Sequence, residues 1–159
     1  MSDQPETHGA KVRLPPPLVF AGFIVAGIVL HYGIFRLPVP LDSVLRSLAG
    51  ALVLLAGLAL GTTTIVMFRR SGQDPRPWTP SPSLLRRGPY KFSRNPMYLS
   101  AMLVQAGLGL LLNNLWIVLF VLPAMIIVHV TAVLPEEAYL GEKFGASYQA
   151  YKATVRRYL

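Results

Sequence analysis

Polar residues that could carry chemistry stand at the end of the last apolar stretch of this sequence. His129 lies inside that stretch, and the acids Glu136 and Glu137 follow it directly after Pro135. If one helix continues through them, His129 and Glu136 share a face about 10 Å apart along the axis. A His inside an apolar stretch is costly without a partner, so we interpret His129 as a functional or interior-facing residue, with a hydrogen bond to another helix as the alternative. The two acids could instead complement the N-terminal dipole of a second helix.

Other kinds of site are excluded by what the sequence lacks. It has no Cys, so thiolate metal sites, disulfides and cysteine nucleophiles are absent. The three His residues, His8, His31 and His129, are too scattered for a zinc or iron site. Gln105 would place an amide at membrane depth, which predicts either a hydrogen bond between helices or a contact with a ligand.

The composition indicates that these residues are positioned by membrane-spanning helices. Of the 159 residues 53% are hydrophobic and only 14% are charged, well below the share usual in soluble domains. The apolar residues gather in four runs of roughly the length that crosses a bilayer, at residues 18–35, 44–68, 98–112 and 115–134. We therefore predict an all-α polytopic membrane protein with about four transmembrane helices. Gly57 and Gly61 have the spacing that lets two such helices approach closely.

The segments between and around the apolar runs complete the predicted organisation. Residues 1–17 read as a polar tail without the apolar run of a secretory signal. Residues 18–68 hold the first two spans, 69–97 a basic and proline-rich loop, and 98–134 a helical hairpin that turns at Asn113 and Asn114. Residues 135–159 read as an amphipathic helix that either lies along the cytoplasmic surface or folds back over the basic loop. Its apolar positions recur at helical spacing, at Leu140, Phe144, Tyr148, Tyr151 and Val155.

The basic residues predict the orientation in the membrane. Nearly half of the 15 Lys and Arg residues lie in the loop 69–97, and others flank the two ends of the chain. By the positive-inside rule, the loop and both termini are cytoplasmic. We interpret the loop's charges as topology signals that also attract anionic membrane lipids, because the segment contains no nucleic-acid-binding module. Nucleic acid is therefore not an expected partner.

Two strings in the second half of the chain closely resemble the isoprenylcysteine carboxyl methyltransferase and phospholipid methyltransferase superfamily of membrane enzymes. The first is Arg-Gly-Pro-Tyr-Lys-Phe-Ser-Arg-Asn-Pro-Met-Tyr at residues 87–98, which matches a G-x-Y-x-x-x-R-(H/N)-P-x-Y segment before a helical hairpin. The second starts at Glu136-Glu137 and continues through Phe144-Gly145, Tyr148 and Tyr151. The resemblance covers roughly residues 83–155, and the short chain with Asn-Pro is similar to the compact bacterial members.

The resemblance implies a methyltransferase of the bacterial inner membrane that uses S-adenosylmethionine, releases S-adenosylhomocysteine and methylates a lipophilic acceptor. It implies that the cofactor is bound by Leu84, Leu85, Tyr90, Asn95, Pro96, Met97, Tyr98 and Glu136. It places Arg94 and Glu137 at the catalytic site, where they would brace the loop against the C-terminal segment. His129 would act as the general base for an acceptor that must lose a proton. Gln105 would contact the acceptor if it does not make a hydrogen bond between helices. No metal is implied.

Some alternatives remain open. The superfamily's eukaryotic prenylcysteine enzymes have His at Asn95 and a substrate-contacting Arg at Ala132, so the resemblance does not define the acceptor or whether it is methylated on O, N or S. The oligomeric state is also undefined. One alternative function is an NADPH-dependent enzyme similar to the sterol reductases, which share part of the C-terminal motif. The other is a small four-helix transporter, although none of the four apolar runs contains an acid.

Overall fold

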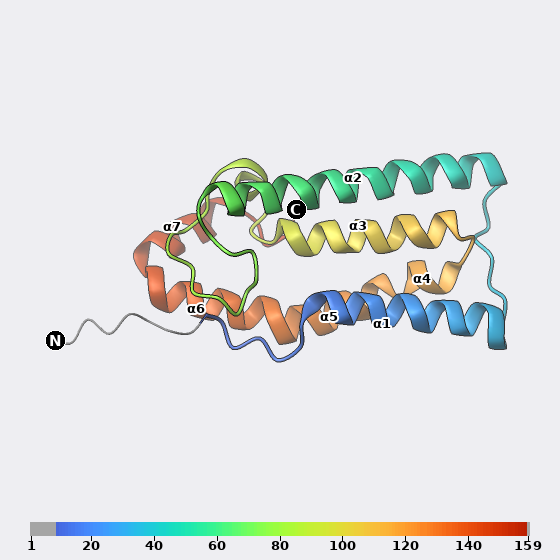
Figure 1. Cartoon of the computed structure of the whole chain (residues 1–159), viewed down its shortest axis with the longest axis horizontal. Helices are drawn as coiled ribbons and strands as arrows, with labels where there is room; N and C mark the ends of the chain where they lie inside the picture. Colours follow the sequence, from blue (N-terminus) through green and yellow to red (C-terminus); the bar gives the residue numbers. More distant parts are fainter. Residues whose placement is uncertain (1–8, 159) are drawn as a thin grey trace.

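A computed structural model describes residues 9–158 and is all-helical over that range, as predicted (Figure 1). The helices are α1 (Pro16–Val29), α2 (Ser43–Arg70), α3 (Pro96–Leu111), α4 (Leu115–Leu119), α5 (Val121–Val128), α6 (Leu134–Phe144) and α7 (Ala146–Thr154). Three shorter turns join or extend them: η1 (Leu30–Ile34), η2 (Gly88–Lys91) and η3 (His129–Val133). The loop between α2 and α3 lies with α6 and α7 at one end of the bundle (Figure 1).

The apolar helices have the lengths that a membrane protein requires. Three of them are long and apolar enough to cross a bilayer by length and composition: Pro16–Ile34, Ser43–Arg70 and Leu115–Phe144. The fourth, α3, has 16 residues and so spans about 24 Å, less than the roughly 30 Å of a hydrocarbon core. Its N-terminal end therefore lies within the depth of the bilayer or at its surface, where the loop that precedes it can meet the helices around it.

Close contact between α2 and α3 depends on glycine. A Cβ atom on Gly57 would lie 2.8 Å from the backbone nitrogen of Val104, and one on Gly107 would lie 2.6 Å from that of Leu54. Both distances are shorter than real Cβ contacts, so only glycine allows the two backbones to approach this closely. This confirms the expected packing role of Gly57. This close packing holds α3 against α2.

The predicted turn at Asn113 and Asn114 is confirmed. Asn113 adopts a positive φ of 51°, and its side-chain oxygen accepts a hydrogen bond from the Val39 nitrogen at 3.0 Å. Asn114 accepts from the Ile117 nitrogen at 3.3 Å, which caps α4, and donates to the Gly27 carbonyl at 3.0 Å. The far end of the bundle is therefore closed by two asparagines.

Of the two possibilities left open at Pro135, the structure has the continuous helix, because one helix of 30 residues runs from Leu115 to Phe144. Pro135 has no N–H and cannot bond the carbonyl of Thr131 four residues earlier. The wider turn η3 lies immediately before it, and the Thr131 carbonyl accepts the Arg13 nitrogen at 3.2 Å instead. The helix ends at Gly145, whose φ of 47° is costly for other residues. The predicted amphipathic helix is thus divided into α6 and α7.

The N-terminal segment differs from the polar tail predicted for residues 1–17. Residues 1–8 of that tail lie outside the described residues, whereas α1 already begins at Pro16. Between them the Gly9 nitrogen bonds the Trp78 carbonyl at 3.3 Å, and the Ala10 nitrogen bonds the Pro77 carbonyl at 3.1 Å. The segment therefore holds part of the proline-rich loop against the bundle.

Candidate active site

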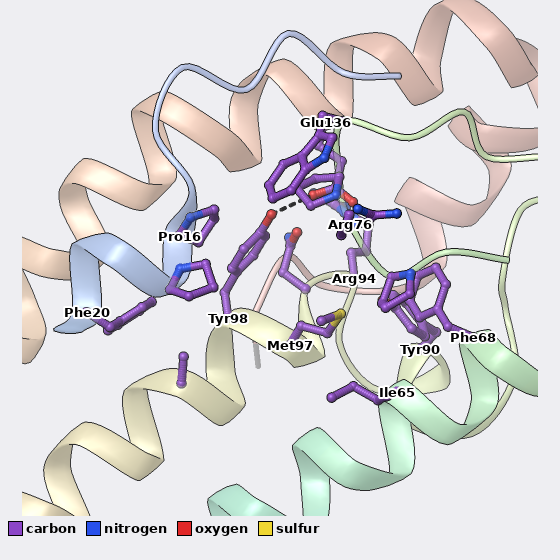
Figure 2. Close-up of a pocket in the computed structure, with 16 residues that line it drawn as sticks. Pro16, Phe20, Ile65, Phe68, Arg76, Tyr90, Arg94, Met97, Tyr98 and Glu136 are labelled. Carbon is purple, nitrogen blue, oxygen red and sulfur yellow. Dashed lines mark hydrogen bonds between the residues drawn. The ribbon is translucent and has the colours of Figure 1, made fainter. Parts of the chain in front are cut away.

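A cavity of about 270 Å³ lies at the loop end of the bundle, near the lower end of the range for small-molecule sites (Figure 2). It lies between the first turns of α1 and α3, the last turns of α2, and α6. Its lining is mostly apolar and consists of Pro16, Pro17, Phe20, Ile65, Phe68, Pro75, Arg76, Pro77, Trp78, Tyr90, Arg94, Asn95, Met97, Tyr98, Ala101 and Glu136.

Glu136 is the one acid among these lining residues, and it meets Tyr98 across the cavity (Figure 2). The Tyr98 hydroxyl donates a hydrogen bond to Glu136 Oε2 at 3.0 Å. The tyrosine comes from the first turn of α3, and the acid from the first turn of α6. A carboxylate in mostly apolar surroundings attracts a cation strongly, because little water screens the charge. The aromatic rings of Tyr90 and Tyr98 nearby would favour the same kind of ligand.

A second cavity of about 40 Å³ adjoins the first and is more polar in its lining. The two share a wall made of Phe68, Tyr90, Arg94, Asn95 and Glu136. On its far side the second cavity is lined by Gln73, Ser81, Ser83, Leu84, Leu85, Glu137, Leu140, Tyr148 and Tyr151. The site is therefore two adjoining spaces, one chiefly apolar and one partly polar, with Glu136 and Asn95 between them.

The shared wall is held by the short turn η2. Gly88 opens this turn with a φ of 56°, which a residue with a side chain rarely adopts. The Tyr90 ring then packs edge-on against Phe68 at 5.9 Å, and its carbonyl accepts the Tyr151 hydroxyl at 2.7 Å. Burial raises the pKa of Tyr90 well above its ordinary value, and the nearby Glu136 and Tyr151 raise it further. Tyr90 therefore stays a neutral wall residue.

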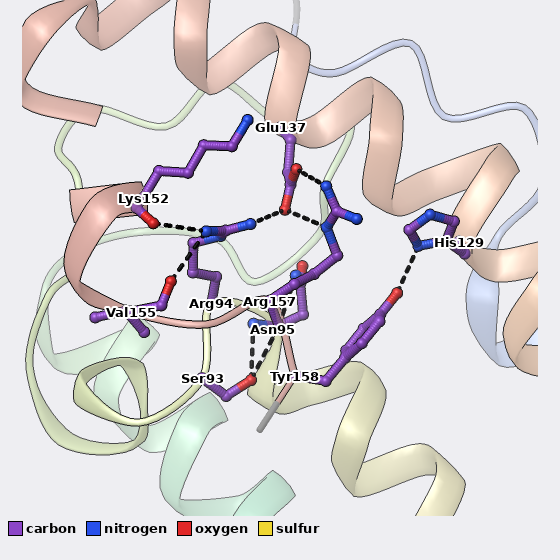
Figure 3. A network of polar contacts seen from close by, with 9 residues as sticks. All are labelled: Ser93, Arg94, Asn95, His129, Glu137, Lys152, Val155, Arg157 and Tyr158. Carbon is purple, nitrogen blue, oxygen red and sulfur yellow. Dashed lines mark hydrogen bonds and ion pairs between the residues drawn. The ribbon is translucent and has the colours of Figure 1, made fainter. Parts of the chain in front are cut away.

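An ion-pair network braces the other side of the wall (Figure 3). Glu137 accepts from Arg94 Nη2 at 3.0 Å and from Arg157 Nε and Nη2 at 3.0 and 2.9 Å. The side chains of Arg94 and Glu137 are only 8% and 9% exposed, so their charges need these partners. Arg94 also donates to the carbonyls of Lys152 and Val155 at 3.1 and 2.9 Å. The hydrogen bonds to Glu137 raise the pKa of Arg157.

The structure brings together most of the residues that the sequence singled out. Those that line one or both cavities are Leu84, Leu85, Tyr90, Arg94, Asn95, Met97, Tyr98, Glu136 and Glu137. Pro96 is buried as the first residue of α3 but lines neither space. Its role here is to start the helix that carries Met97 and Tyr98.

Besides Pro96, two more predicted residues lie outside both cavities. His129 belongs to the turn η3, and its Nδ1 lies 2.7 Å from the Tyr158 hydroxyl, so it does not share the cavity with Glu136. Gln105 is fully buried in α3 and donates to the Ile117 carbonyl at 3.0 Å. The structure thus favours the alternative stated for each residue, a hydrogen bond within the protein, over a contact with the acceptor.

Sequence reasoning missed three groups of residues. Pro16, Pro17 and Phe20 of α1 and Trp78 of the loop carry no motif and enter the cavity only through packing. Tyr148 and Tyr151 were recognisable as buried positions by their helical spacing, but not as part of a site. Arg157 and Tyr158 follow the last recognised motif position, so no sequence signal identified them.

Comparison with known proteins gives one family. The model of a family described as phospholipid methyltransferase matches residues 45–147, which is more than half of the chain. The matched stretch runs from the start of α2 into α7 and includes the loop, α3 and Glu136. No curated protein gives a significant match to the chain.

Proposed function

We propose that this chain, which belongs to the phospholipid methyltransferase family, transfers a methyl group from S-adenosylmethionine to a lipophilic acceptor at the membrane surface. The observation that carries the proposal is the position of Glu136 in the wall between the two cavities, hydrogen-bonded to Tyr98. A methyltransferase must hold a cationic donor and an acceptor in two adjoining spaces and keep water away from both. Two connected spaces around one carboxylate have this form, with the smaller space, of about 40 Å³, taking only part of the donor and the rest of it extending along the shared wall.

The residues of the site fit this cofactor chemically. Arg94 Nε is one of the few buried side-chain polar atoms without a hydrogen-bond partner in the described part of the chain. Because Arg94 lines both cavities, a ligand carboxylate such as that of the cofactor's amino-acid part would provide the missing acceptor. Glu136 offers the opposite charge to the sulfonium or the ammonium group. Leu84, Leu85 and Leu140 give the smaller cavity an apolar side.

When bound, the cofactor would supply an activated methyl group on a sulfonium, which needs no metal for its transfer. The protein then has to orient the donor and the acceptor and to exclude water from both. Glu136 and the tyrosine rings would hold the positive charge close to the shared wall. Proline and aromatic side chains from α1 and the loop would keep water out of the larger cavity.

The acceptor belongs in the larger cavity on this proposal. Phe20 and Ala101 extend its apolar lining along α1 and α3, and Ile65 extends it along α2. These are helices of the membrane bundle, so the apolar part of a lipid acceptor could remain in the bilayer while its reactive end reaches Glu136. By the positive-inside rule, the loop and both ends of the chain face the cytoplasm, where the cofactor is made. The proposal therefore includes this orientation and a location in the bacterial inner membrane.

Calorimetric titration of the detergent-purified protein tests the cofactor. We expect saturable binding of S-adenosylhomocysteine and no binding of NADPH at equal concentrations. Binding of NADPH without S-adenosylhomocysteine would contradict the proposal and favour the reductase alternative. Binding of neither ligand would also contradict it, and would favour the transporter alternative. The titration needs no knowledge of the acceptor, so it tests the cofactor alone.

Filling the larger cavity should separate the two parts of the site. Replacing Ala101 by phenylalanine adds a ring to the lining, so we expect methyl transfer to lipids to fall about tenfold or more while S-adenosylhomocysteine binding is kept. The assay follows tritiated methyl groups from S-adenosylmethionine into vesicles of total membrane lipid. Ala56→Phe on the exposed face of α2 is the matched control. Equal methyl transfer by both variants would show that the acceptor lies elsewhere.

A further inference from the structure

After α7 the chain runs back across the loop that precedes α3 (Figure 3). The carbonyl of Arg156 accepts the Arg94 nitrogen at 2.9 Å. The carbonyl of Arg157 accepts two side-chain donors, Ser93 Oγ at 3.2 Å and Asn95 Nδ2 at 3.1 Å. These contacts come from residues 155–158, the C-terminal segment, which lie beyond the family match at residues 45–147. Their partners at residues 93–95 lie inside the matched region.

The side chain of Arg157 fixes where this segment lies. Its Nε and Nη2 donate to the two oxygens of Glu137 at 3.0 and 2.9 Å, which is the two-point geometry that only arginine provides. Glu137 stands on α6 next to Glu136 and is itself held by Arg94. These two hydrogen bonds, the Arg157 fork, therefore attach the C-terminal segment to α6, the helix that carries Glu136.

This arrangement determines what Asn95 presents to the cavities. Asn95 is only 6% exposed and lines both spaces. Its Nδ2 is engaged by the Arg157 carbonyl, so its oxygen lies on the opposite side of the planar amide (Figure 3). An amide held in this way offers an acceptor to a ligand that carries N–H or O–H groups. Without the carbonyl of Arg157, the amide could rotate and offer a donor instead.

We infer that Arg157 is a positioning residue of the cofactor site: its guanidinium holds Glu137, its carbonyl orients Asn95, and neither group needs to touch the cofactor. The inference rests on the proposed function, since it assigns a support for the same site. Arg157 thus acts on two parts of the site, through its backbone carbonyl on Asn95 and through its guanidinium on Glu137. Tyr158 completes the attachment, because its hydroxyl lies 2.7 Å from His129 Nδ1 and its ring packs against the buried core.

Two adjacent arginines provide the test. Arg157→Ala removes the two hydrogen bonds to Glu137. Arg156→Ala removes the same charge from the neighbouring residue, whose side chain is exposed. We expect Arg157→Ala to weaken S-adenosylhomocysteine binding roughly tenfold, the factor typical of a lost hydrogen bond to a charged group. Arg156→Ala should bind like the unmodified protein. Arg157→Lys keeps the charge without the fork and should restore only part of the affinity, and added methylguanidinium should restore part of it in Arg157→Ala.

Amide hydrogen exchange supplies a second measurement that needs no cofactor. In Arg157→Ala we expect faster exchange in residues 93–98, where the Arg94 nitrogen loses its fixed acceptor, and unchanged exchange in the far halves of α2 and α3. If the unmodified protein binds no S-adenosylhomocysteine, the proposed function fails, while the exchange result still decides whether Arg157 orders the loop. Equal affinity and equal exchange in Arg157→Ala and Arg156→Ala would overturn the inference.

Discussion

Replacing Glu136 by glutamine is expected to weaken binding of S-adenosylmethionine by roughly 10- to 100-fold, the range for a lost charge-assisted contact. Glutamine has nearly the same shape and can still accept the Tyr98 hydroxyl, which donates to Glu136 Oε2 at 3.0 Å. The change therefore removes the negative charge and little else. Calorimetric titration in detergent measures the loss. Glu142→Gln, an exposed acid on the same helix, is the matched control and should have no effect.

A second ligand shows which part of the cofactor Glu136 faces. S-adenosylhomocysteine lacks the positive charge on sulfur but keeps the ammonium group. If Glu136 lies beside the sulfonium, Glu136→Gln loses more affinity for S-adenosylmethionine than for S-adenosylhomocysteine. If it lies beside the ammonium group, both ligands lose affinity equally. Unchanged affinity for both would remove Glu136 from the site and contradict the proposed function.

The sequence could predict those parts of the site that are set by local order. Glycine, proline and tyrosine at residues 88–98 define a turn followed by a helix start, and the structure has η2 and α3 at these places. The same local order puts Asn95, Met97 and Tyr98 at the first turn of α3. Their grouping with Glu136 was predictable because both strings resemble one superfamily, and that resemblance implied one cofactor pocket for them.

His129 illustrates why spacing alone could not complete the site. The predicted shared face with Glu136 assumes 3.6 residues per turn throughout. The turn η3 (His129–Val133) is a wider helix with more residues per turn, so it rotates His129 away from Glu136 and toward Tyr158. A π-helical turn of this kind depends on packing and on Pro135, and hydrophobic periodicity does not report it.

Contacts between distant segments account for what else was missed. Arg156 and Arg157 are identical in type and adjacent, yet only Arg157 reaches Glu137, twenty residues earlier in the chain. In the same way Phe20 lines the cavity because α1 packs against α3 and α5, not because of its neighbours in sequence. Tertiary packing determines which of these residues reach the site, so a single sequence contains no signal for them.

Arg94→Met is the substitution expected to cost the most stability. Arg94 joins the loop to three places, Glu137 on α6 and the carbonyls of Lys152 and Val155 at the end of α7. Methionine fills a similar volume but makes none of these bonds and leaves a carboxylate that is 9% exposed with only one of its two cations. Breaking a buried ion pair from one side costs about 3 kcal/mol or more. We expect a correspondingly lower midpoint of denaturation in detergent.

The loss should begin locally, because Arg94 is what attaches α7 and the C-terminal segment to the loop. Trypsin cuts after Lys152, Arg156 and Arg157, so these bonds should be cleaved faster in Arg94→Met before the apolar helices unfold. Arg87→Met, which alters an exposed arginine of the same loop, should match the unmodified protein in both measurements. Arg94→Lys retains the charge and should fall between them, since a single ammonium group cannot replace the planar guanidinium that serves three acceptors. If Arg94→Met and Arg87→Met denature and digest alike, the ion pair between Arg94 and Glu137 does not hold this end of the protein together, and Arg157 alone suffices to hold the Glu137 carboxylate.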